Sequence, residues 1–280
     1  MHSQRWLTAI ILIPLVVSII YFSAPWFFTL FVWAASLVAL YEYYGIVLSA
    51  SGQKQQLSPL ALSGFLAGTV IVFSAAAGRY DLVCLVLCGM LLFSGALALG
   101  RYGRQPDALE NVLKQITGLV YLPLILSLAA VLHRSQHGAT WVFLLLIIVF
   151  VGDTGAYYAG TYLGRHKLLP RVSPKKTVEG ALGGLLATVL AGCAVNGIFP
   201  VLPFGLDMPR LPWAGAVILF ITISICGQAG DLFESILKRE SGVKDSGVIF
   251  PGHGGLLDRI DAVLFAIPVA YLFKVYVFSA

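Results

Sequence analysis

The chain has 280 residues, of which 59% are hydrophobic and only 11% are charged, and its formal net charge is +5 at neutral pH. Its mean hydropathy is +0.89. These values exclude an ordinary soluble globular protein and indicate a polytopic helical membrane protein.

Apolar runs of membrane length follow one another along the chain. A transmembrane helix needs about 20 mostly apolar residues. The first run lacks a convincing signal-peptide cleavage site, so we expect it to remain as an uncleaved span. We therefore predict an all-α polytopic transmembrane fold of about nine spans, at 6–22, 26–49, 60–78, 82–100, 117–133, 139–163, 180–203, 213–237 and 262–278.

Basic residues are distributed unequally between the segments that join these spans. When the segments are numbered from zero at the N-terminus, most of the 18 Lys and Arg residues fall in even-numbered segments. Cytoplasmic loops carry an excess of Lys and Arg. The pattern therefore predicts that the even-numbered loops and the N-terminus face the cytoplasm, and that the C-terminus lies outside.

The composition changes near residue 139. The part before it consists almost entirely of apolar spans with short loops, whereas the part after it contains two long charged loops, 164–179 and 238–261. We therefore expect N-terminal transmembrane helices in 1–138, and C-terminal transmembrane helices that carry the functional site in 139–280.

Two other groups of residues predict structural roles. Four cysteines lie in apolar runs without metal or disulfide spacing, which predicts buried thiols; they are Cys84, Cys88, Cys193 and Cys226. The aromatic stripe of Tyr41, Tyr43 and Tyr44 is typical of a belt at the membrane interface.

The first polar constellation occupies 152–180, with the sequence GDTGAYYAGTYLGRHKLLPRVSPKKTVEG. It places five cations in 165–176, just before a glycine-rich helix. A helix start presents unpaired N–H groups to an anion, so this segment fits a phosphate cradle. A positive-inside loop with a Ser/Thr cap would contain the same residues. The candidate nucleotide contacts are Asp153, Ser173, Lys175, Lys176 and Thr177.

The second constellation, 228–261, concentrates charge in a chain that has little of it. Asp231, Glu234 and Lys238 recur at helical spacing, and so do Asp258 and Asp261, so each set shares one helix face. Mg²⁺ in proteins usually takes one or two carboxylates together with phosphate oxygens. We therefore predict that Asp231 and Asp258 bind a metal and that Asp261 supports them.

A glycine-rich turn, 251–255, separates the two helix faces. Irregular backbone at membrane depth is tolerated only where it is buried in protein or lines a water-filled cavity. Within this turn His253 fits a hydrogen-bonding strut, a phosphate contact or a proton carrier. A salt-bridged interfacial loop is the simpler alternative for the whole segment. The cations that could neutralise phosphates are Lys238, Arg239, Lys244 and Arg259.

Residues 235–261 resemble the full signature of the CDP-diacylglycerol synthase (phosphatidate cytidylyltransferase) family. The matching pattern is Ser-x-x-Lys-Arg, Lys-Asp, and Pro-Gly-His-Gly-Gly-x-x-Asp-Arg-x-Asp. Residues 152–180 resemble the family's Asp-x-x-Ala-Tyr and Ser-Pro-x-Lys-Thr-x-Glu-Gly elements, although Val178 replaces an aromatic residue found in many relatives. The N-terminal third is similar only as hydrophobic spans.

The resemblance implies transfer of CMP from CTP to phosphatidic acid, with release of pyrophosphate. It implies Mg²⁺, with a K⁺ ion sharing the site, and places both metal-binding acids at Asp231 and Asp258. It also implies a homodimer in the bacterial inner (plasma) membrane, with the active site facing the cytoplasm. The catalytic set it implies is Asp231, Lys238, Arg239, His253, Asp258, Arg259 and Asp261, while Lys244 joins the nucleotide contacts.

Two other functions fit parts of the pattern. A CTP-dependent lipid kinase, acting on a polyprenol for example, would need a general base near the lipid hydroxyl, and the complete 235–261 signature argues against it. A transporter would spread ionisable residues through several mid-membrane spans. We expect no nucleic-acid partner, because topology and phosphate binding account for the net charge.

Overall fold

The computed structural model describes residues 14–48, 56–104, 107–198, 210–247, 249 and 254–278. The chain packs into two compact units, each of which is described by itself. Unit 1 contains residues 14–15, Ser23–Val131 and Glu240–Arg259. Unit 2 contains Val16–Phe22, Leu132–Arg239 and the described part of Ile260–Ala280.

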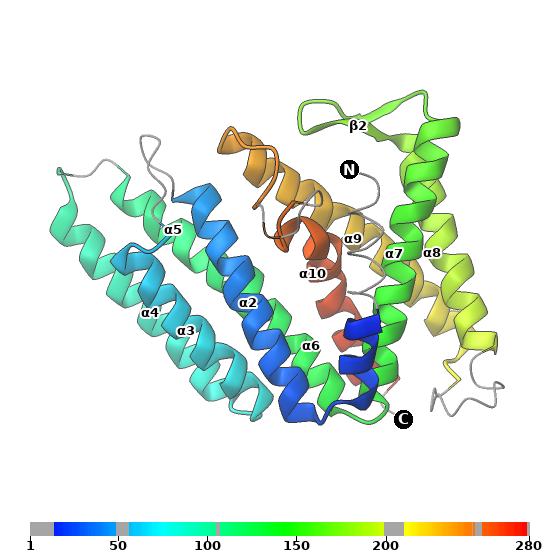
Figure 1. Ribbon diagram of the computed structural model, residues 1–280, viewed down its shortest axis with the longest axis horizontal. Coiled ribbons are helices and arrows are strands. Elements are labelled where there is room, and N and C mark those ends of the chain that lie inside the picture. The colour runs from blue at the N-terminus through cyan, green and yellow to red at the C-terminus, as the bar shows by residue number, and fades with distance from the viewer. Residues whose placement is uncertain are drawn as a thin grey trace. The chain divides into compact units, whose positions relative to one another are not determined.

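Unit 1 is built from antiparallel helices, and Figure 1 shows α2, α3 and α4 side by side. The chain enters α3 through a typical start signal, because the Ser58 hydroxyl accepts a hydrogen bond from the Ala61 N–H and a proline follows Ser58. The elements are α2 (Pro25–Val47), α3 (Pro59–Ala76), α4 (Tyr80–Arg101), α5 (Ala108–Leu119), the π-helix η1 (Val120–Leu124) and α6 (Ile125–Arg134), whose last turn belongs to unit 2.

One membrane-length helix is longer than the sequence indicates. The predicted span 117–133 is the second part of a helical run that begins at Ala108 and continues through α5, η1 and α6. Lys114, which we expected in a loop, lies on α5 and pairs with Glu110 at 2.7 Å. Pro123 has no N–H to donate within a helix, and it lies in the wider π-turn of η1.

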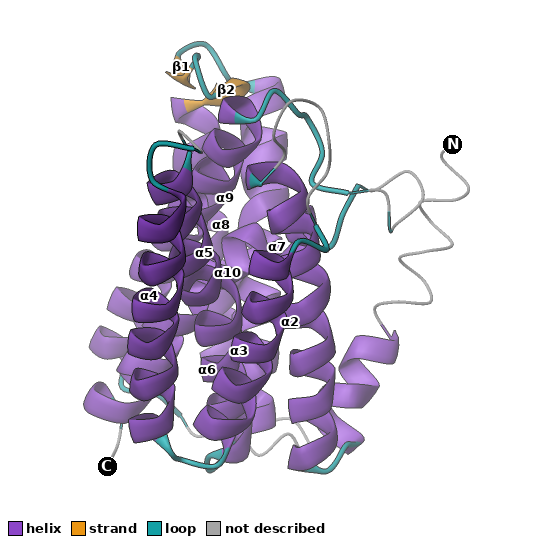
Figure 2. Cartoon of the chain, turned by 90° about the vertical axis from the view of Figure 1, so that its left-hand side faces the viewer, coloured by secondary structure: helices purple, strands orange, loops and turns teal. Residues whose placement is uncertain are grey.

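Unit 2 combines long helices with a small hairpin, and Figure 2 shows the two strands at one end of α7 and α8. Unit 2 carries most of the predicted site residues, on its helices and on β2. The elements are α7 (Gly138–Tyr162), β1 (Lys167–Leu169), β2 (Ser173–Thr177), α8 (Val178–Ile198), α9 (Trp213–Glu240), α10 (Leu257–Leu272) and the π-helix η3 (Phe273–Val277). The last residue of α9 and the first three residues of α10 belong to unit 1.

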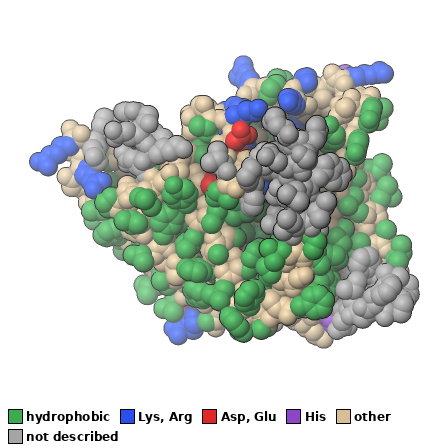
Figure 3. Space-filling view, viewed as in Figure 1, with side chains coloured by type: hydrophobic (Ala, Val, Ile, Leu, Met, Phe, Trp, Pro, Cys, Tyr) green, Lys and Arg blue, Asp and Glu red, His purple; other side chains and the backbone are tan. Residues whose placement is uncertain are grey.

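Eight helical segments of the described residues are long and apolar enough to cross a membrane. Each overlaps one of the eight predicted spans from 26–49 to 262–278, so the all-α polytopic membrane fold is confirmed. Part of the first predicted span, 6–22, lies outside the described residues. The described part, 14–22, is helical. Figure 3 shows hydrophobic side chains over much of one face, and Lys and Arg at the margins of that face.

The close approach of α7 and α8 depends on small residues. A Cβ atom built at Gly155 would overlap the Ala187 methyl group, and one built at Gly183 would overlap the Ala159 methyl group. Small residues at such positions let two membrane helices bring their backbones together. This packing fixes α8 against the helix that carries Asp153.

We expect Gly183→Val to destabilise unit 2, because the added side chain must push α7 and α8 apart. Overpacking of this kind typically costs about 1–3 kcal/mol. The measurement is the Tm of purified protein in detergent. Gly89→Val on α4 is the matched control, because a Cβ there meets nothing within 4 Å; equal Tm values for both variants would contradict this account of the packing.

Two of the structural predictions are wrong in part. Tyr43 and Tyr44 are 1% and 0% exposed, and the Tyr43 hydroxyl donates to the Lys114 carbonyl at 2.9 Å, so these rings belong to the interior and not to an interfacial belt. Cys84 and Cys88 are exposed on α4. An apolar run predicts membrane depth, but it does not say whether a side chain faces protein or lipid.

Candidate active site

The predicted cytoplasmic loop 164–179 contains a hairpin that the sequence did not predict. Strands β1 and β2 pair antiparallel, with Lys167 opposite Thr177. The Glu179 carboxylate accepts hydrogen bonds from the Arg165 N–H at 3.0 Å and the His166 N–H at 3.2 Å, and it contacts the His166 ring at 2.6 Å. These bonds fold the basic segment back against the start of α8.

Thr177 joins the hairpin to α8. Its buried hydroxyl accepts a hydrogen bond from the Gly180 N–H at 3.1 Å, so it caps the first turn of the helix. The Ser/Thr cap weighed in the sequence is therefore present, and a phosphate contact by Thr177 stays a prediction. Ser173 is half-buried on β2 and Lys175 is exposed there.

Lys176 connects the hairpin to α9. Its Nζ lies 2.6 Å from Oδ2 of Asp231, and both side chains are partly exposed. Asp153 on α7 and Asp261 on α10 lie within electrostatic range of Asp231. We call Asp153, Asp231 and Asp261 the carboxylate cluster; three separate helices bring these like charges together in unit 2.

Two lysines counter the carboxylate cluster. Lys176 attracts Asp153 as well as Asp231, and Lys238 attracts Asp261. Lys238 also forms an ion pair with Glu234, one helical turn earlier on α9, whose side chain is fully buried. The predicted acidic face of α9 is therefore present, with each acid paired to a different lysine.

A glycine allows Asp231 and Asp261 to lie near each other. A Cβ atom at Gly230 would lie 2.5 Å from the Asp261 carbonyl oxygen and 3.0 Å from the Phe265 Cβ. Only a residue without a side chain lets α9 and α10 approach so closely at this level. The glycine before Asp231 thus has a packing role in addition to its place in the sequence motif.

Arg239 fixes the end of α9 against the hairpin. Its Nε donates to the Val172 carbonyl oxygen at 3.3 Å. The guanidinium is otherwise on the surface, as is expected of a cation that meets a substrate. A catalytic role for Arg239 stays a prediction.

Asp258 lies in unit 1, at the beginning of α10. Its Oδ2 accepts hydrogen bonds from the Ser246 N–H at 2.9 Å, the Ser246 hydroxyl at 2.9 Å and the Gly255 N–H at 2.8 Å. Gly254 precedes this contact with a φ of 82°, a conformation that favours glycine. Ser246, Gly255 and the Asp258 carboxylate therefore hold one another in one arrangement, while the rest of the predicted turn, 251–253, lies outside the described residues.

Three predicted site residues remain, namely Lys244, His253 and Arg259. Lys244 and Arg259 are exposed in unit 1. His253 lies outside the described residues.

The sequence model of the Cytidylyltransferase family matches residues 3–277. The chain belongs to the cytidylyltransferase family. The resemblance recognised in residues 152–180 and 235–261 is therefore confirmed.

Several bacterial relatives of this chain are named phosphatidate cytidylyltransferase. The Haemophilus influenzae protein is 32% identical, over 99% of this chain and 100% of the relative. The Bacillus subtilis protein is 43% identical over 50% of this chain, and the Mycobacterium leprae protein is 39% identical over 58%. In these two alignments the chain spans about half the length of the relative, 49% and 50% respectively.

The carboxylates of this cytidylyltransferase-family protein fit a divalent cation. No group of three or more His, Cys, Asp or Glu side chains in the described part of the chain is spaced to hold a metal by itself. Mg²⁺ needs only one or two carboxylates, because water and substrate phosphates complete its shell. Asp153, Asp231 and Asp261 offer carboxylate oxygens, the ligand type that Mg²⁺ prefers. In unit 1, hydrogen bonds orient the Asp258 carboxylate as metal-ligating carboxylates commonly are oriented.

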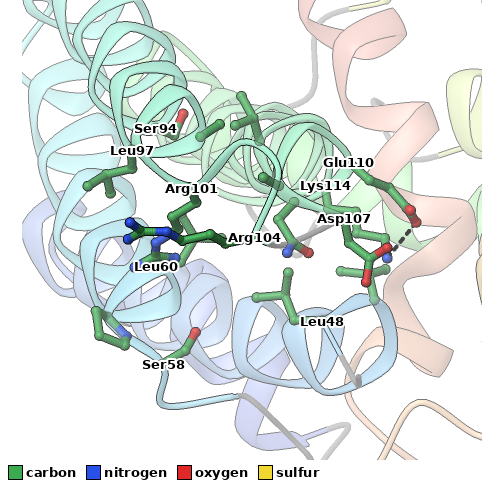
Figure 4. Close-up of a pocket in the computed structure, with 16 residues that line it drawn as sticks. Leu48, Ser58, Leu60, Ser94, Leu97, Arg101, Arg104, Asp107, Glu110 and Lys114 are labelled. Carbon is green, nitrogen blue, oxygen red and sulfur yellow. Dashed lines mark ion pairs between the residues drawn. The ribbon is translucent and has the colours of Figure 1, made fainter. Parts of the chain in front are cut away.

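Each of the two units contains a cavity. The cavity in unit 1 has a volume of about 420 Å³. Figure 4 shows Arg101 and Arg104 among its lining residues, with the Lys114–Glu110 ion pair at its edge. None of the predicted site residues lines it. In unit 2 a cavity of about 10 Å³ borders Asp153 and Thr188, which is room for about one water molecule.

One buried acid was not among the residues predicted from the sequence. Glu42 on α2 is 2% exposed and accepts three hydrogen bonds from the signature segment in unit 1. The signal was present, because an ionisable residue inside an apolar membrane-length run is by default a functional candidate. Its position between the tyrosines of the supposed interfacial belt concealed it.

Proposed function

We propose that the protein is a CTP:phosphatidate cytidylyltransferase, a nucleotidyltransferase that makes CDP-diacylglycerol for phospholipid biosynthesis. The observation that carries this proposal is the unbroken signature at 235–261. The similarity to the Haemophilus influenzae protein over the whole chain supports it.

In the proposed reaction the substrate supplies its own nucleophile. A phosphate monoester oxygen of phosphatidic acid attacks the α-phosphorus of CTP and forms the new P–O bond. The bond from the α-phosphorus to the oxygen that bridges to the β-phosphate breaks, and pyrophosphate leaves with that electron pair. The protein therefore needs no serine or cysteine nucleophile, and its task is to position two anions and to stabilise charge.

The lysines of unit 2 are suited to this task. Lys176 already balances Asp231, and Lys238 balances Glu234 and Asp261. Phosphate oxygens that enter beside these ion pairs would find cations held in place, which lowers the cost of reorganisation when charge builds up on the leaving group. Arg239, Lys244 and Arg259 complete the set of cations that we propose for the substrate phosphates.

We propose Mg²⁺ as the cofactor, with a K⁺ ion sharing its site. When bound, the divalent ion would neutralise phosphate charge in the transition state. We propose Asp231 and Asp258 as its ligands, an assignment that rests on the sequence motif. We propose that Asp153 and Asp261 support it, because their carboxylates lie within electrostatic range of Asp231.

The location and partners follow from the same proposal. Phosphatidic acid keeps its acyl chains in the bilayer, and CTP comes from the cytosol, so we propose an active site on the cytoplasmic face of the bacterial inner membrane. The charge asymmetry of the loops supports this orientation. We also propose a homodimer and no nucleic-acid partner.

A substrate-dependence assay tests the reaction. Purified protein in detergent, given Mg²⁺ and CTP, is expected to release pyrophosphate only when phosphatidic acid is present. Diacylglycerol is the matched control, because it has the same acyl chains without the phosphate nucleophile. Pyrophosphate release with diacylglycerol, or without lipid, would contradict the proposal.

A further inference from the structure

Glu42 is a charged residue in an otherwise uncharged membrane-length helix. It is the single Asp, Glu, Lys or Arg of α2, and its side chain is 2% exposed. A buried carboxylate is costly unless hydrogen bonds or a partner charge compensate it. The groups that compensate the Glu42 carboxylate therefore indicate its role.

Those partners all belong to the signature segment, more than 200 positions later in the chain. Oε1 accepts from the Leu256 N–H at 2.9 Å, and Oε2 accepts from the Leu257 N–H at 2.8 Å and the Ser246 hydroxyl at 3.1 Å. Helix α10 begins at Leu257. Glu42 thus caps the first turn of α10 from another helix, where unpaired N–H groups and the positive end of the helix dipole favour a carboxylate.

The same contacts reach Asp258. The Ser246 hydroxyl lies 3.1 Å from Glu42 Oε2 and 2.9 Å from Asp258 Oδ2. A hydroxyl has one proton to donate, so it serves one carboxylate at a time. Because each carboxylate also accepts two backbone N–H groups, both remain compensated, and the positions of Glu42 and Asp258 are coupled through Ser246.

Glycines make room for this arrangement. A Cβ atom at Gly247 would lie 2.5 Å from Glu42 Oε1, and one at Gly255 would lie 2.5 Å from both Glu42 carboxylate oxygens. The signature backbone therefore folds around the Glu42 carboxylate at two separate points. This explains part of the glycine content of the motif without reference to any ligand.

We propose that Glu42 is a positioning residue for the signature segment, and that it fixes the start of α10 and through it the carboxylate of Asp258. Glu42 contacts the backbone and Ser246, so it acts through these groups on the reaction. The kinetic part of this inference rests on the proposed function, whereas the structural part does not.

The test is Glu42→Gln in the full-length protein. A glutamine side chain keeps the shape but has one acceptor oxygen, and its NH₂ group faces an N–H donor. We expect kcat for CMP transfer to fall about 10–100-fold, as for partners that orient metal-ligating carboxylates, and KM for CTP to change by less than about threefold. Amide exchange in residues 254–262, measured without substrate or metal, should accelerate by about tenfold or more.

Two further variants make the result decisive. Glu110→Gln is the matched control, because Glu110 is an exposed carboxylate of the same unit and pairs only with Lys114 among the interactions of the described residues; it should change neither kcat nor exchange. Ser246→Ala removes one of the three donors to Glu42 and should act in the same direction with a smaller effect, which keeps the inference testable if Glu42→Gln does not fold.

Several outcomes would overturn the inference. One is an unchanged kcat per folded molecule with a lowered Tm, which would reduce Glu42 to a purely structural residue. Another is a lowered kcat with unchanged exchange in 254–262, which would place its effect elsewhere. If the wild-type protein transfers no CMP, the proposed function fails, and the exchange measurement alone still decides whether Glu42 fixes α10.

Discussion

Replacing Asp231 with asparagine is expected to lower turnover by about 100-fold or more while the protein still inserts and folds. The substitution keeps the shape of the side chain but removes its charge, so it weakens both the ion pair with Lys176 and the proposed metal site. The measurement is kcat for pyrophosphate release at saturating CTP and phosphatidic acid, with the Tm in detergent as a check on folding.

Asp81→Asn provides the control for Asp231→Asn. Asp81 is an exposed carboxylate on α4 that also pairs with a neighbouring cation, Arg79, at 2.8 Å. A surface ion pair of this kind contributes little, so the control should keep wild-type turnover. If Asp231→Asn kept more than about a tenth of wild-type activity, the assignment of Asp231 to the metal would be wrong.

Asp258→Asn is expected to have a similarly large effect, with a different structural signature. Asp258 accepts three hydrogen bonds at one oxygen, from Ser246 and Gly255. Loss of its charge should lower kcat by about 100-fold or more and should also loosen the signature turn, which Asp231→Asn should leave intact. Amide exchange in residues 254–262 distinguishes the two variants.

A separate result would contradict the prediction for Asp258→Asn. An Asp258→Asn protein that exchanges faster in 254–262 but retains most of its turnover would show that Asp258 holds the turn and does not take part in the reaction. A matched change at Asp107, which precedes α5 outside the predicted site, should alter neither quantity.

Hydropathy predicted most of the fold. The eight described membrane-length helices lie where apolar runs predicted them, because the requirement for about 20 apolar residues is a property of the segment alone. The extra helical turns of α5 were missed because Glu110 and Lys114 resemble a loop in composition, although their spacing lets them pair on one helix face.

The candidate site was predicted less completely. Spacing along one helix correctly grouped the acids of α9, but it did not reveal that Lys176 on β2 would pair with Asp231, because that contact joins residues far apart in the chain. The hairpin was missed because its strands are short and contain proline and lysines. Glu42 was missed because it lies between Tyr41 and Tyr43 of the supposed interfacial belt, and its hydrogen-bond partners follow more than 200 positions later in the chain.

The most direct test of the central claim uses CTP labelled either at the α-phosphate or at the γ-phosphate, with purified protein, Mg²⁺ and phosphatidic acid. The account predicts that the α-label enters an organic-extractable CDP-lipid, that pyrophosphate appears in equal amount, and that the γ-label stays in solution. Transfer of the γ-label to an added polyprenol, with no α-label in lipid, would contradict the account and favour a lipid kinase. No transfer of either label would contradict it as well and would favour a transporter.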